Sequence, residues 1–67
     1  MFLNSGDNPE YNDATLYFDE GGYWGKLTPG ARLAANTYEG HLWNVKVNDV
    51  IVKTWVIGAD DQQKFVL

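Results

Sequence analysis

Cysteine is absent from this chain of 67 residues, which excludes disulfide staples, thiolate metal sites and cysteine nucleophiles. The same absence leaves the compartment open, because it fits either redox environment. Long hydrophobic runs are also missing, and none approaches the roughly 20 apolar residues that a membrane span requires. The apolar start at residues 1–3 gives way at once to the polar residues 4–9, so no signal peptide is expected. These absences predict a soluble protein and make the cytoplasm a candidate compartment.

Basic residues are few: five Lys and Arg stand against nine Asp and Glu, for a formal net charge of -4. The resulting field repels phosphate backbones and anionic lipid surfaces, so neither nucleic acid nor a membrane is an expected partner. Only one histidine is present, and the Asp-rich loops lack the spacing of a calcium loop, so no metal site or other cofactor is expected. No nucleophile with its base and orienting group, and no oxyanion motif, is recognisable, which argues against an enzyme.

What the chain does contain is typical of a small β-protein. Its length allows one domain, residues 1–67, near the lower size limit for a core without staples. Aromatic residues make up 15% and hydrophobic residues 45%, which predicts a core rich in aromatic rings and valine. The only helical pattern, at residues 31–35, is too short to be stable alone.

Strand signals, by contrast, recur between clusters of Gly, Pro, Asn and Asp. They predict an all-β fold, a small antiparallel β-sandwich of about seven short strands. The strands are expected at residues 1–4, 15–18, 23–26, 33–37, 41–47, 50–56 and 64–67. Residues 4–13 are interpreted as a polar loop or twisted connection.

The most regular segment, residues 41–56, predicts a β-hairpin closed by Asn48 and Asp49, since both side chains tolerate positive φ and the flanking valines favour strands. A uniform ladder gives this hairpin a core face of three opposed pairs, Val47–Val50, Val45–Val52 and Trp43–Thr54. The opposite face, suited to solvent or to a partly covered sheet, carries Leu42, Asn44, Lys46, Ile51, Lys53 and Trp55.

A second hairpin is predicted around Gly40, which can adopt the left-handed conformation that closes a three-residue loop with a bulge. That loop gives the opposed pairs Thr37–His41 and Ala35–Trp43. A shorter loop gives the pair Tyr38–His41 instead, and the residues alone do not decide between the two.

The residues around this second hairpin resemble a known family. Residues 27–30 read Leu-Thr-Pro-Gly, and seven positions after Gly30 residues 37–43 read Thr-Tyr-Glu-Gly-His-Leu-Trp. This resembles the von Hippel-Lindau β-domain family, which has Leu-Pro-Pro-Gly followed at equal spacing by Ser-Tyr-Arg-Gly-His-Leu-Trp. Residues 16–19, Leu-Tyr-Phe-Asp, are similar to its Leu-Asn-Phe-Asp, and residues 2–5 and 63–65 are fainter matches.

The resemblance implies a β-sandwich with an aromatic surface pocket for a peptide that contains 4-hydroxyproline. The ligand-binding positions that it implies are Trp24, Asn36, Thr37, Tyr38, His41 and Trp43. Thr37 takes the place of a serine and His41 that of a histidine, which together hydrogen-bond the ligand's hydroxyl. Trp43 takes the place of a pocket tryptophan against which the ring stacks.

The remaining implied positions are peripheral, and two departures accompany them. Trp24, or Tyr23 if the loop shifts by one, replaces a tyrosine that contacts the peptide backbone. Tyr38 stands beside the pocket and Asn36 replaces a histidine that contacts the peptide. Thr15 stands where the family has a second pocket tryptophan, and the likeness does not extend to the helical domain that recruits a ubiquitin ligase.

We therefore expect a non-catalytic module that binds a proline- or hydroxyproline-containing peptide. A neutral imidazole and a hydroxyl can together donate to and accept from the ligand's hydroxyl, which favours this interpretation. Three alternatives stay open. Thr37 and His41 can simply satisfy each other, the aromatic face can bind carbohydrate, or the chain can form a homo-oligomer through residues 65–67 and Trp55.

Overall fold

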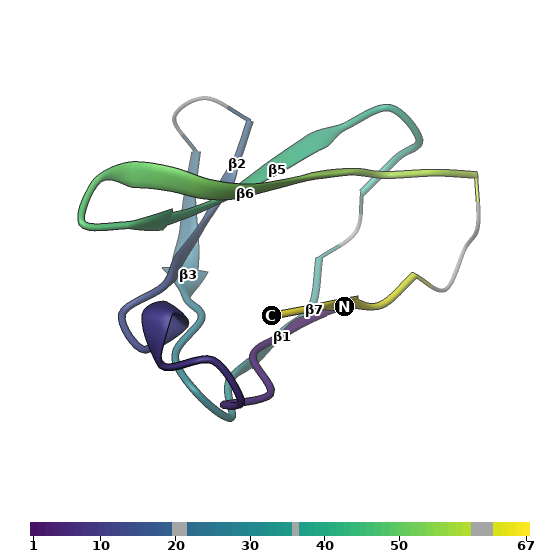
Figure 1. Ribbon diagram of the computed structural model, residues 1–67. Coiled ribbons are helices and arrows are strands. Elements are labelled where there is room, and N and C mark those ends of the chain that lie inside the picture. Colours follow the sequence, from purple (N-terminus) through teal and green to yellow (C-terminus); the bar gives the residue numbers. More distant parts are fainter. Residues whose placement is uncertain (20–21, 36, 60–62) are drawn as a thin grey trace.

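Two sheets face each other (Figure 1), and an aromatic core lies between them. The structure is a computed structural model that describes residues 1–19, 22–35, 37–59 and 63–67. Its strands are β1 (Phe2–Leu3), β2 (Thr15–Phe18), β3 (Gly22–Lys26), β4 (Arg32–Leu33), β5 (Leu42–Val47), β6 (Val50–Val56) and β7 (Phe65–Val66). The only helical element in these ranges is a single 3-10 turn, η1 (Pro9–Tyr11), within the predicted polar connection. The predicted small all-β fold is thus confirmed.

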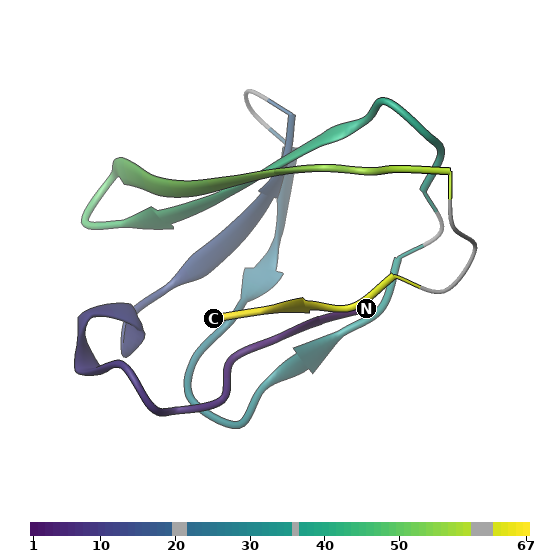
Figure 2. The same cartoon turned by 45° about the vertical axis from the view of Figure 1, so that its right-hand side comes forward.

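One sheet has four strands in the order β3-β2-β5-β6, all antiparallel, and the other has three in the order β4-β1-β7. In the smaller sheet β1 pairs with β4 antiparallel but with β7 parallel, with Phe2 opposite Phe65. Figure 2 shows the two ends of the chain running side by side. Parallel strands need a long connection, and residues 4–64 provide it here. No helix in the described ranges is long and apolar enough to cross a membrane.

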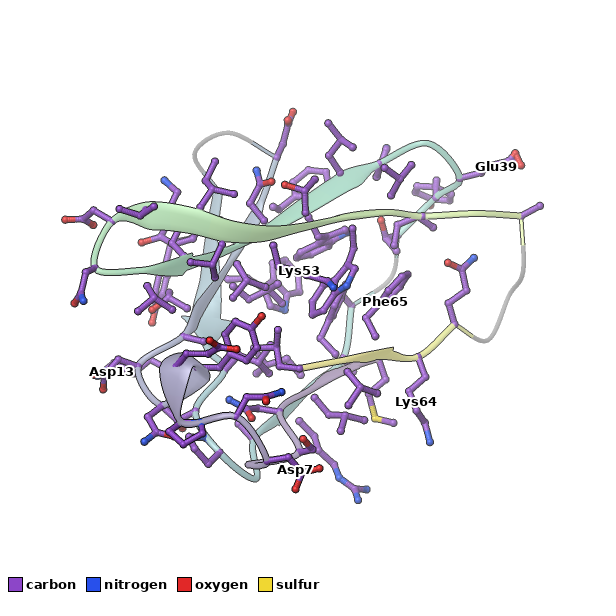
Figure 3. All side chains as sticks on the ribbon, in the orientation of Figure 1. Asp7, Asp13, Glu39, Lys53, Lys64 and Phe65 are labelled. Atoms are coloured by element: carbon purple, nitrogen blue, oxygen red, sulfur yellow. The ribbon has the colours of Figure 1, made fainter. Side chains whose placement is uncertain are left out.

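The core lies between the sheets and is dominated by rings. The ring centroid of Phe2 is 4.8 Å from that of Trp43, 5.7 Å from that of Trp55 and 5.4 Å from that of Phe65. Phe65 points into this layer, while Lys64 beside it points away (Figure 3). The buried hydrophobic residues are Phe2, Ala14, Leu16, Leu27, Trp43, Val45, Trp55, Ile57 and Leu67. The core is therefore aromatic as predicted, but it holds one valine rather than many.

The β5–β6 hairpin begins as predicted and then changes register. Asn48 and Asp49 have φ values of 52° and 64°, and Val47 pairs with Val50. Beyond Ile51 a β-bulge adds one residue to β6, so that Val45 lies opposite Lys53 and Trp43 opposite Trp55. The predicted pairs Val45–Val52 and Trp43–Thr54 are therefore wrong.

Because one extra residue reverses which face every later side chain occupies, the bulge brings Trp55 into the core. Trp55 is 9% exposed, although it was predicted on the opposite face. Val50 and Val52, predicted to be buried, are 61% and 42% exposed. Val52 is the extra residue of the bulge, and Val50 follows the turn at the end of the hairpin that lies away from the two-residue strands β1 and β7 (Figure 1).

A buried asparagine fastens the segment that leads from β1 to η1. The Asn4 side chain is 2% exposed, and its Nδ2 donates to the carbonyl oxygens of Tyr11 and Leu27, each at 2.9 Å. Its Oδ1 accepts from the Gly6 N–H at 2.9 Å, while its backbone N–H donates to the Ala31 carbonyl. One amide therefore joins β1 to η1 and to the connection between β3 and β4.

Candidate functional site

The loop before β5 closes around Gly40, which has a φ of 90° as expected for a left-handed residue. The predicted hairpin between residues 33–37 and 41–47 is nevertheless wrong. β4 ends at Leu33 and pairs with β1 in the other sheet, so Ala35 has no ladder partner in Trp43. His41 N–H donates to the Tyr38 carbonyl, the contact that the shorter-loop alternative expects. The loop is also joined to the end of β6, where Gly40 N–H donates to the Ile57 carbonyl and Ile57 N–H donates to the His41 carbonyl.

Three of the predicted site residues meet through hydrogen bonds. Thr37 Oγ1 and His41 Nδ1 share a hydrogen bond of 3.2 Å, and Trp43 Nε1 donates to the same Oγ1 at 3.2 Å. Thr37 and His41 are half-buried, whereas Trp43 is 1% exposed. Thr37 and His41 are therefore hydrogen-bonded to each other, as the first of the three alternatives expects. Trp43 belongs to the core, and its ring is not open for stacking.

Phe18 is part of the site although sequence reasoning did not single it out as a ligand position. Its ring centroid lies 5.2 Å from that of His41 and 4.9 Å from that of Trp43, opposite which it stands in the β2–β5 ladder. The next residue is held in place because Asn44 Nδ2 donates to the Asp19 carbonyl at 2.7 Å. A signal was present, since alternation from the buried Leu16 places Phe18 on the same face of β2.

Trp24 reaches the site because of a second bulge. Leu16 pairs with Gly25 and Tyr17 with Tyr23, which leaves Trp24 as the extra residue of β3. Bulges commonly redirect a side chain, and here the Trp24 ring lies edge-on to Trp43, with centroids 5.2 Å apart. Trp24 is 45% exposed. Of the two alternatives from the sequence, Trp24 contacts the site, while the Tyr23 ring packs at 5.9 Å against Tyr17.

The outer end of the site is Tyr38, whose ring lies 5.8 Å from that of His41 and which is 74% exposed. Glu39 points outward from the same loop (Figure 3). Asn36, also predicted as a ligand residue, lies outside the described residues. Thr15 stands between Lys26 and Lys46 in the sheet, three residues before Phe18, and contributes no wall.

The site is therefore a chain of five rings with one hydroxyl beside it, and we call it the ring cluster. In order of contact its members are Trp24, Trp43, Phe18, His41 and Tyr38. Exposed rings stand at both ends, and between them lie the polar atoms of Thr37 and His41 and the indole N–H of Trp43. Within the described ranges no three acidic or histidine side chains gather as metal ligands. This arrangement suits an apolar ligand that carries few polar atoms.

A scan against protein-family models, a search of curated proteins and a search of solved structures find no match for the chain.

Proposed function

We propose that this chain is a non-catalytic peptide-binding module of the von Hippel-Lindau β-domain type. Its ligand is a proline-containing segment, preferably one with a hydroxyl at C4 of the ring. The observation that carries the proposal is the hydrogen-bonded Thr37–His41 pair, which lies between two exposed aromatic side chains, Trp24 and Tyr38. The sequence resemblance at residues 27–43 supports the choice of ligand.

Proline segments suit such a surface for a physical reason. They are already extended, so little conformational entropy is lost on binding, and aromatic rings provide the apolar contact. Because Trp43 is covered, stacking falls to Trp24 and Tyr38. A hydroxylated ring adds one polar atom that can bond at Thr37 or His41. The preference over plain proline arises because polar groups at the site stay better paired with the hydroxylated ligand.

The proposal is tested by calorimetry with one peptide synthesised in two forms, with proline and with 4-hydroxyproline. Changing His41 to Ala is expected to weaken binding of the hydroxylated peptide by about 1 to 3 kcal/mol and of the plain peptide much less. Trp24→Ala should weaken the binding of both peptides, because it removes apolar contact. Equal affinity of the parent for the two peptides, or no heat with either at millimolar ligand, would contradict the proposal.

A carbohydrate ligand is the second candidate, and a different surface favours it. Tyr17 and Tyr23 form an edge-to-face pair on the outer face of the larger sheet, Tyr23 is 61% exposed, and Lys46 Nζ lies 4.5 Å from the Tyr17 ring centroid. Exposed rings of this kind stack on sugars.

Adjacent residues provide the matched control between the two candidates. Tyr23→Ala removes a ring from the outer face, whereas Trp24→Ala removes one from the ring cluster. A peptide ligand should therefore respond to Trp24→Ala and not to Tyr23→Ala. If an oligosaccharide binds the parent and Trp24→Ala but not Tyr23→Ala, the ligand is a carbohydrate and its site is the outer face.

A further inference from the structure

Thr37 Oγ1 accepts a hydrogen bond from a group that has no alternative role. The indole N–H of Trp43 is a donor only, and it lies 3.2 Å from this oxygen. Trp43 is 1% exposed, so its indole N–H is shielded from water and bonds to Thr37 Oγ1 instead. One lone pair of the Thr37 hydroxyl is therefore used, and the direction of its own hydrogen remains to be assigned.

His41 Nδ1 lies 3.2 Å from the same oxygen, which allows two arrangements. Either the Thr37 hydroxyl donates to an unprotonated Nδ1, or a protonated Nδ1 donates to the Thr37 oxygen. In the second arrangement the oxygen accepts twice, and its hydrogen meets no acceptor among the described residues. The first arrangement pairs the indole N–H, the Thr37 hydroxyl and Nδ1 within the protein, whereas the second leaves the hydroxyl hydrogen to water, so the first arrangement is favoured.

We infer that Trp43 and Thr37 are positioning residues, which hold neutral His41 in the tautomer that carries its proton on Nε2. The hydrogen bonds then run in one direction, from Trp43 Nε1 to Thr37 Oγ1 and from Thr37 Oγ1 to His41 Nδ1. No described residue accepts from Nε2, so the imidazole offers this N–H to a ligand. The site therefore selects a ligand with a hydrogen-bond acceptor, and a ligand donor is not required.

For the ligand, this inference rests on the proposed function and makes it more specific. The C4 oxygen of a modified proline is bound as an acceptor. A carbonyl oxygen at C4 should serve as well as a hydroxyl, while plain proline offers no acceptor there. The ligand class is thus a peptide whose proline ring carries an acceptor oxygen at C4.

The tautomer is measured independently of any ligand by nitrogen-15 NMR of the imidazole at alkaline pH, where the ring is neutral. The chain has a single histidine, so the imidazole signals belong to His41, and the two nitrogens are told apart by their different couplings to the ring C–H protons. We expect an unprotonated Nδ1 and a protonated Nε2 in the parent. Thr37→Val should let the ring populate both tautomers, and Thr37→Ser should restore the parent pattern. A protonated Nδ1 in the parent overturns the inference, as does a Thr37→Val tautomer identical to the parent's.

The ligand preference is measured with three versions of one peptide, carrying 4-hydroxyproline, 4-oxoproline or proline. We expect the 4-oxo peptide to bind within about threefold of the hydroxylated one, and both to bind more tightly than plain proline. A 4-oxo peptide as weak as plain proline shows that the ligand must donate, which overturns the acceptor preference. If none of the three binds and the parent shows the expected tautomer, the proposed function fails and the tautomer assignment stands.

Discussion

Asn4 is a single side chain whose identity affects three segments of the backbone. Its Nδ2 donates to two carbonyl oxygens, those of Tyr11 and Leu27, in a position that is 2% exposed. The sequence predicts residue 4 only as the junction between the first expected strand, residues 1–4, and the polar connection at residues 4–13. Nothing local distinguishes it from the exposed Asn8, because its partners lie 7 and 23 residues away in the chain.

Changing Asn4 to Asp should destabilise the fold by about 3 kcal/mol or more, because it removes both donors and turns a buried carboxylate toward two carbonyl oxygens. That is a large share of the stability of a small domain. The midpoint of denaturant unfolding measures the effect. Asn8→Asp is the matched control, since Asn8 is exposed and its side chain makes no capping hydrogen bond. Equal midpoints for the two variants would show that the Asn4 amide is unimportant.

At the scale of elements, local chemistry predicts turns better than it predicts partners. The Asn48–Asp49 turn and the left-handed Gly40 follow from residues next to each other, and both are found. The bulge in β6 does not, because Ile51 and Val52 carry no local signal for it. It follows from a competition over burial: a uniform ladder would bury Thr54 and expose Trp55, and burial of the indole contributes several kcal/mol more.

Val52 is the residue that this bulge adds, so its deletion should leave Trp55 opposite Trp43. The deletion variant is expected to fold with Trp55 still buried and to lose at most about 2 kcal/mol of stability. Insertion of one alanine after Val52 is the matched control. It demands a wider bulge or turns Trp55 to solvent, and it should cost considerably more.

Thermal melts and tryptophan fluorescence of the deletion and insertion variants measure both expectations. An unfolded deletion variant beside an insertion variant that melts like the parent would mean that the bulge itself stabilises the hairpin.

The partner of β4 depends on a strand that is distant in the sequence. The turn residue between residues 33–37 and β5 predicts a hairpin, yet Leu33 pairs with Phe2. Both pairings satisfy the same alternation of side chains, and only the position of β1 decides between them. The side chains of Thr37 and His41 still meet, because the tight turn around Gly40 is local.

For the whole molecule, the fold class was predictable because strand signals recur along the entire chain. The distribution of exposed apolar surface was not predictable, since it depends on how far one sheet covers the other. β6 is at an edge of its sheet in the described structure, and Val50, Ile51, Val52 and Val56 on it are 42% to 61% exposed. An apolar edge of this kind invites pairing with another chain.

We therefore expect the native mass to rise with concentration through pairing at β6. Trp55, one basis of the predicted homo-oligomer, is buried and takes no part. Ile51→Lys should lower the tendency to associate, since it places a charge on the open edge. Leu42→Lys is the matched control, because Leu42 is 40% exposed but lies on the inner strand β5. Sedimentation equilibrium measures both, and a mass of one chain at every concentration would exclude the association.

The parallel pairing of β1 with β7 has a mechanical consequence. The chain enters β1 at one end and leaves β7 at the other, so tension applied to Met1 and Leu67 pulls the two strands past each other. Phe65 N–H donates to the Met1 carbonyl, Leu67 N–H to the Leu3 carbonyl, and Ser5 N–H to the Leu67 carbonyl. These hydrogen bonds lie across the direction of pull, so they resist the force together and must break together. Stretching from the ends therefore shears this pair of strands as one unit before it can peel the larger sheet apart strand by strand.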